Sequence, residues 1–175
     1  SKHAIKLIKK EGRELDAIQN LNIASELGVI STSYWSLKEN EKAIENQLQA
    51  LEIYQKVGSK SQIAWSYESL GMIYSQTDQQ MMAIDSFVAG LEVYRELNND
   101  IAIARILDSI GVIYRDLGKL DMAMRFLNDA INKYKDLNNK LGEAKSLSDI
   151  AVIYETRGQY EKALEIYKNN FEIFN

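Results

Sequence analysis

The sequence predicts an all-α solenoid of antiparallel helix hairpins, and two series of residues carry this prediction. A tyrosine recurs every 40 residues, at Tyr34, Tyr74, Tyr114 and Tyr154. An alanine keeps the same interval, at Ala43, Ala83, Ala123 and Ala163. Self-similarity with a period of 20–50 residues is typical of stacked repeats, which usually act as binding surfaces.

Within each repeat the apolar residues follow a helical spacing. In the third repeat Ile103, Leu107, Ile110 and Tyr114 lie three or four residues apart, which places them on one helix face. A turn around Gly118 follows, because glycine readily takes the left-handed conformation that ends many helices. A second apolar series then leads to Asn138 and Asn139, residue types that favour the start of the next helix. Each repeat is therefore expected to be helix, turn, helix.

The predicted hairpins cover about 14–58, 59–98, 99–138 and 139–175, and residues 1–13 are predicted to end the helix of a preceding repeat. Gly118 and Gly158 share a turn position that Lys38 and Asp78 occupy in the earlier repeats, so those two turns are expected to differ in geometry. The C-terminal helix carries aromatic residues with no polar helix after it, whereas terminal repeats normally have a polar outer face. We therefore expect a fragment of a longer protein, or an end that another chain covers.

Composition and charge exclude several classes of protein. The 46% of hydrophobic and 26% of charged residues are ordinary for a folded domain. No apolar run approaches the roughly 20 residues that cross a bilayer, and no secretory signal is visible. The absence of cysteine excludes disulfides and fits a cytoplasmic location. Net charge is −4 overall, and residues 1–13 are basic, so the remainder is acidic, which argues against direct binding of nucleic acid.

A family resemblance follows from these residues. Residues 107–114, which end in Ile110-Gly111-Val112-Ile113-Tyr114, and the later run from Gly158 to Leu164 resemble the tetratricopeptide repeat. The resemblance covers about residues 20–175, and it implies a right-handed superhelix of helical hairpins. Two features depart from the family pattern: the period is 40 rather than 34, and the proline near the repeat end is missing. Similar long repeats occur in cell-polarity adaptors and in bacterial peptide-sensing regulators.

Catalytic and metal chemistry find little support in the sequence. His3 is the only histidine, so neither a histidine-rich metal site nor a histidine-based triad can be assembled. There is no phosphate-binding glycine loop or dinucleotide fingerprint. Carboxylates such as Glu68, Asp78, Asp108 and Asp116 are expected to be solvated groups on helix surfaces. The sequence thus predicts no enzyme activity, no catalytic residue, no metal and no cofactor.

The resemblance implies a binding groove, because the first helices of tetratricopeptide repeats line the concave side. Carried over by register, the candidate partner-binding residues are Trp35, Trp65, Glu68, Met72, Gln76, Arg105, Asp108, Arg115, Lys145 and Ser148. Trp and Arg are common anchors of interfaces. The two tryptophans have an alternative as filling between neighbouring helices. The alternative for Arg105, Arg115 and Lys145 is ion pairing with nearby acidic residues of the chain.

The function expected from these features is a protein-interaction scaffold that binds a peptide or helix of a partner in the concave groove. The alternative is a sensory or dimerising region of a larger signalling or transcription-regulatory protein. Both predict a protein or peptide partner and no contact with a membrane. The aromatic C-terminal helix also leaves homo-oligomerisation through the last repeat open.

Overall fold

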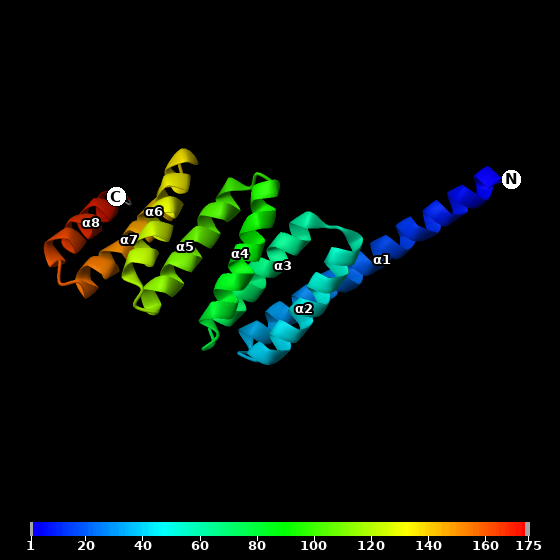
Figure 1. The fold of residues 1–175 in the computed structure, drawn as a ribbon, viewed down its shortest axis with the longest axis horizontal. Helices are drawn as coiled ribbons and strands as arrows, with labels where there is room; N and C mark the ends of the chain where they lie inside the picture. The colour runs from blue at the N-terminus through cyan, green and yellow to red at the C-terminus, as the bar shows by residue number, and fades with distance from the viewer. Residues whose placement is uncertain (1, 174–175) are drawn as a thin grey trace. The chain divides into compact units, whose positions relative to one another are not determined.

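In the computed structural model the backbone is described for residues 2–173 and the side chains for residues 16–171. This part of the chain contains helices and no strand, which confirms the predicted all-α class (Figure 1). The helices are α1 (Lys2–Ser36), α2 (Asn40–Val57), α3 (Lys60–Ser75), α4 (Gln80–Glu96), α5 (Asp100–Asp116), α6 (Leu120–Asp136), α7 (Lys140–Thr156) and α8 (Tyr160–Ile173).

The chain forms two compact units, Ser1–Val93 and Tyr94–Asn175. In the first unit α1 packs on α2, and α2 packs on α3. In the second unit α5 packs on α6, α6 on α7, and α7 on α8. The short turns between these helices make sequential neighbours antiparallel (Figure 1). Each unit therefore consists of stacked helix hairpins.

The N-terminal part of the chain differs from the expected division at residue 13. Helix α1 continues without a break from Lys2 to Ser36, and its first part (blue in Figure 1) extends past the end of α2. The side chains of residues 1–15, which include His3, lie outside those that the structure describes.

Small residues set the distance between the two helices of a hairpin. The recurring alanines are 0% exposed at Ala43, Ala83 and Ala123, and 2% exposed at Ala163. On the facing helix, a Cβ atom at Gly111 would lie 2.7 Å from Cγ of Leu127. A separation below 3 Å is a clash, so glycine is what allows the two helices to approach this closely.

A residue with the left-handed backbone conformation follows most of the helices, as expected for the glycines but not for Lys38. Gly118 and Gly158 have φ angles of 72° and 71°, and Lys38 takes φ 63° at the equivalent position. The expected difference at Lys38 is therefore wrong, because a single left-handed lysine costs only about 1–2 kcal/mol. Among the described non-glycine residues Asp78 does not adopt positive φ, so this turn does differ.

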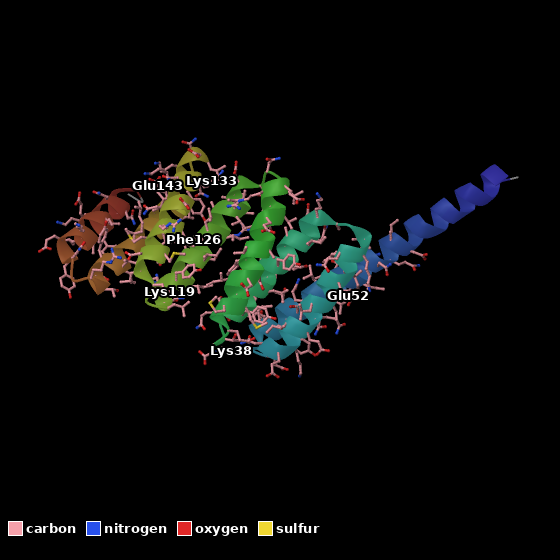
Figure 2. All side chains as sticks on the ribbon, in the orientation of Figure 1. Lys38, Glu52, Lys119, Phe126, Lys133 and Glu143 are labelled. Carbon is pink, nitrogen blue, oxygen red and sulfur yellow. The ribbon has the colours of Figure 1, made fainter. Side chains whose placement is uncertain are left out.

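Helix starts and hairpin cores follow the predicted pattern. The side chain of Asn139 accepts a hydrogen bond from the backbone N–H of Gly142 over 2.9 Å, which caps α7. Between α5 and α6 the rings of Tyr114 and Phe126 stack with centroids 5.4 Å apart. Phe126 is labelled on α6 in Figure 2. The repeating tyrosine is thus part of the packing inside a hairpin.

Replacing Ala123 by leucine should overpack the contact between α5 and α6. Because Ala123 is fully buried, the added atoms have no space, and we expect a loss of about 1–3 kcal/mol in the free energy of unfolding. Chemical denaturation measures this loss. Asn128→Leu, at an exposed position of the same helix, is the matched control and should change stability little. Unchanged stability of Ala123→Leu would contradict the assigned register.

Candidate binding surface

In the first unit, Trp65 of α3 lies against the backbone of α1. A Cβ atom added at Gly28 would lie 3.2 Å from Cζ3 of the Trp65 ring, so glycine at this position lets the indole approach the helix. Trp65 nevertheless keeps 41% of its surface exposed. The ring is therefore held against α1 while one part of it remains available to a ligand.

An open pocket of ≈ 330 Å³ lies beside this ring. Its lining comes from the first helices α1 and α3 together with one residue of α2: Ser25, Gly28, Val29, Thr32, Ser33, Ser36, Tyr54 and Trp65. No residue in this lining carries a charged side chain. Val29 is 64% exposed, so aliphatic and aromatic surface is presented together. Concave sites of this type suit an apolar group of a ligand.

The hydroxyl groups of the lining are largely engaged with their own helix. Thr32 Oγ1 donates to the carbonyl of Gly28 over 3.0 Å, Ser33 Oγ to Val29 over 2.9 Å, and Ser36 Oγ to Thr32 over 2.9 Å. Such bonds to the residue four positions earlier satisfy the hydroxyl hydrogens within the helix. An apolar ligand group that enters the pocket therefore breaks few hydrogen bonds between these hydroxyl groups and water.

The other predicted residues of this unit have mixed environments. The indole N–H of Trp35, which is half-buried, donates to Oε1 of the exposed Gln76 over 2.9 Å, so this tryptophan is tied to α3 as the packing alternative expects. Met72 is half-buried. Glu68 is only 3% exposed, which corrects the expectation that it is a solvated surface group.

A larger hollow in the same unit, of ≈ 530 Å³, lies at the turns that follow α1 and α3. Its lining is mostly polar, and Lys42 Nζ and Glu39 Oε2, 2.5 Å apart, already pair with each other. An exposed pair of this kind contributes little energy, and a ligand group that bound to either residue would have to compete with the other. The pocket beside Trp65 is therefore the better candidate for ligand binding.

In the second unit, Asp108 of α5 is a buried carboxylate rather than a surface group. It is 0% exposed, which corrects the sequence-based expectation. Ser146 Oγ donates to Asp108 Oδ1 over 2.5 Å, and Lys145 Nζ lies 2.7 Å from Asp108 Oδ2. Both partners come from α7, the first helix of the next hairpin. Burial of a charge is tolerated here because both carboxylate oxygens have a donor.

Arg115 links the same two helices further along. Its guanidinium pairs with Asp116 of α5 over 2.8 Å and with Asp149 of α7. Burial raises the pKa of the Asp149 carboxyl and the charge of Asp108 adds to this rise, while Arg115 and Lys145 oppose it. For Arg115, burial favours the neutral form, but the bonds and charges of Asp116 and Asp149 outweigh it and raise its pKa. The predicted ion pairing is thus confirmed for Arg115 and Lys145.

The last two predicted residues lie on α5 and α7. Arg105 is exposed on α5. Ser148 Oγ donates to the carbonyl of Ala144 over 3.0 Å and accepts a hydrogen bond from Asn170 Nδ2 of α8 over 2.9 Å. Ser148 therefore helps to hold α8 on α7. The ten candidate residues divide between the two units, five in each.

Sequence reasoning missed several residues that shape these surfaces. Gly28 and Tyr54 complete the Trp65 pocket, and Ser146 and Asp149 complete the buried polar contacts. The repeat period in the sequence relates the two groups of contacts. Positions 28 and 65 are two periods before 108 and 145, so the Trp65–Gly28 contact occupies the same place as the Lys145–Asp108 pair.

The described residues carry no sign of metal chemistry or of a membrane span. Among them, no group of three or more His, Cys, Asp or Glu side chains is placed to hold a metal ion. Within the same range, none of the helices is both long enough and apolar enough to pass through a bilayer.

Replacing Ser146 by alanine should destabilise the second unit. The change removes a donor from the fully buried Asp108 carboxylate, and an unsatisfied buried group costs about 1–3 kcal/mol. Thermal or urea unfolding measures the loss. Ser109→Ala is the matched control, since Ser109 donates only to the carbonyl of Arg105 in its own helix. Equal effects of the two changes would contradict the role assigned to Ser146.

The Asp149 carboxyl should titrate above its ordinary value of 3.8 in the folded protein. Carbon-detected NMR of the side-chain carboxyl measures the midpoint. Asp108→Asn removes a like charge and should lower this midpoint, whereas Arg115→Gln removes a cation and should raise it. Because the folded-state pKa is raised, the stabilisation from this group is complete below the unfolded-state pKa. It is lost as the pH rises through the folded-state pKa. A midpoint below 3.8 would refute this account.

Several solved structures of other proteins share this fold. Aspartyl phosphate phosphatase F from Bacillus subtilis superimposes with a TM-score of 0.81 at 18% identity, over 87% of this chain and 40% of that one. BtubC (BKLC) from P. vanneervenii gives 0.77 at 19%, over 86% and 62%. The Rap conjugation gene regulator of the plasmid pLS20, solved in complex with the Phr* peptide, gives 0.75 at 17%, over 90% and 43%. Identities this low show the fold alone, and this chain spans less than two thirds of each.

The sequence itself carries the family assignment. No curated protein matches it significantly. The tetratricopeptide repeat family, however, matches residues 21–96 and 102–174, so that each compact unit contains most of one matched stretch. Since these matches cover most of the sequence and the helices follow the family's hairpin pattern, the chain belongs to the tetratricopeptide repeat family.

Proposed function

We propose that this chain is a protein-interaction module whose first helices bind a peptide segment of a partner protein. The open, uncharged pocket beside Trp65 carries the proposal, because it offers a ligand apolar surface that the fold itself leaves uncovered. The family supports it, and a structural relative has been solved with a bound peptide. Burial of one aliphatic or aromatic side chain in the pocket supplies about 1.5–3 kcal/mol.

In the second unit, the first helices α5 and α7 offer charged groups rather than an apolar anchor. Asp108, Arg115, Lys145 and Asp149 are already joined in ion pairs, so a charged ligand group has to compete with an existing partner. Charged groups of this kind set register and exclude wrong partners more than they add affinity.

Replacing Trp65 by alanine should weaken a bound peptide by more than about 1 kcal/mol, which is roughly fivefold or more in Kd. A peptide selected from a displayed random library against the intact chain serves as the probe, with titration calorimetry as the readout. Met81→Ala is the matched control, because Met81 is an exposed apolar residue of a second helix, outside the pocket lining. Unchanged affinity of Trp65→Ala would eliminate this assignment of the surface, as would a library without any selectable binder.

A second candidate function is a sensory or dimerising region of a larger regulatory protein. A relative named as a conjugation gene regulator favours it, since this chain matches 43% of that protein's length. In this case a peptide that binds the isolated chain should also alter the activity of the complete natural protein. A complete protein whose output does not respond to the bound peptide would contradict this second candidate.

A further inference from the structure

Helix α2, which packs on α1 and α3, buries an uncharged polar side chain. Gln47 is 0% exposed, and neither its Nε2 atom nor its Oε1 atom has a hydrogen-bond partner among the described residues. A buried amide without partners loses its hydrogen bonds to water on folding and gains none in return. Gln47 therefore favours any state of α2 in which its amide group reaches water.

The positions equivalent to Gln47 in α4 and α6 are apolar. They are Phe87, which is 1% exposed, and Leu127, which is 0% exposed. Each packs against a glycine of the preceding first helix. A Cβ atom at Gly71 would lie 2.6 Å from Cδ1 of Phe87, and one at Gly111 would lie 2.7 Å from Cγ of Leu127. These two hairpins thus use the position for close apolar contact, and the first hairpin does not.

Ser31 of α1 occupies the position of these glycines, and it does not pair with Gln47. Its Oγ atom donates to the carbonyl of Ala43 over 2.8 Å, so the hydroxyl hydrogen is already used. Leu127 belongs to the buried apolar cluster of its own hairpin. The buried cluster of the first hairpin leaves Gln47 out and consists of Ala24, Ala50 and Tyr54. Gln47 therefore interrupts the apolar packing that holds α2 in place.

The pocket beside Trp65 depends on the position of α2. Tyr54 of α2 lines this pocket together with residues of α1 and α3. Detachment of α2 removes Tyr54 from the lining, so the pocket is complete only while α2 is packed. A ligand that binds one of two states shifts the equilibrium toward that state. A ligand in the complete pocket is therefore coupled to the packing of α2.

We infer that α2 is a conformational switch of the first unit: it detaches transiently from α1 and α3, because Gln47 reaches water in the open state, and a peptide in the Trp65 pocket holds it closed. The second part rests on the proposed function, and the first part does not. Local opening of this kind requires less free energy than global unfolding and is typical of elements that ligands control. Helix α6, with Leu127 at the same position, lacks this cause of opening.

Amide hydrogen exchange of the intact chain tests the opening without a ligand. The backbone amides of α2 should be protected about tenfold less than those of α6, or less still, because opening relieves the unsatisfied amide of Gln47. Gln47→Leu should raise the protection of α2 by about tenfold or more and leave α6 unchanged. Gln49→Leu, at an exposed position of the same helix, is the matched control and should change the protection little. Equal protection of α2 and α6 overturns the inference, and so does a Gln47→Leu variant whose α2 is no better protected than that of Gln49→Leu.

The same measurement with the library-selected peptide tests the coupling. At about 100 times its Kd, a peptide that binds only the closed state should raise the protection of α2 about a hundredfold. Trp65→Ala should lose most of this added protection at the same peptide concentration. A peptide whose affinity depends on Trp65 but which leaves the protection of α2 unchanged overturns the coupling. A library without any binder removes the proposed function and the coupling together, whereas exchange in the free chain still decides whether α2 opens.

Discussion

The distance between paired helices is set by alanine and glycine residues whose surroundings leave no space for a larger side chain. The alanine near the start of each second helix is 0–2% exposed, and Gly71 and Gly111 leave space for Phe87 and Leu127. Since the two backbones meet at these points, a larger side chain at either one moves a whole helix rather than a single rotamer. The period of 40 residues preserves the contact from hairpin to hairpin, and it thereby decides which face of each helix remains available for binding.

The same register supports different chemistry in the two units. Between α5 and α7, Lys145 and Ser146 meet the buried carboxylate of Asp108. Two periods earlier, Trp65 meets Gly28 between α3 and α1, and the buried hydroxyl of Ser66, the equivalent of Ser146, makes no hydrogen bond. Where the second unit has the buried carboxylate of Asp108, the first unit has Gly28, and an open, uncharged pocket lies at this place instead of a closed polar contact. This difference is the physical reason to expect a ligand's apolar anchor in the first unit.

The sequence predicted the features that recur and missed those that depend on a single pair. The tyrosine and alanine series led to the helix hairpins, and Gly118 led to the turn, because these positions obey local rules that repeat. The burial of Asp108 was not predictable in this way. Its spacing places it on a helix surface, and only the neighbouring α7 shows that this surface is covered. The pocket beside Trp65 likewise depends on the absence of a side chain at Gly28.

Deletion of one hairpin tests most directly whether the repeat register holds the fold together. Removing residues 99–138 joins Asn98 to Asn139 and recreates the Asn–Asn turn that links α6 to α7, where Asn138 has φ 53°. If the register holds the fold together, the shortened chain should keep its helicity per residue by circular dichroism and should unfold cooperatively. Removing residues 119–138, which deletes α6 alone, should abolish cooperative unfolding. A disordered product of the first deletion, or equal behaviour of the two shortened chains, would show that the repeat register does not hold the fold together.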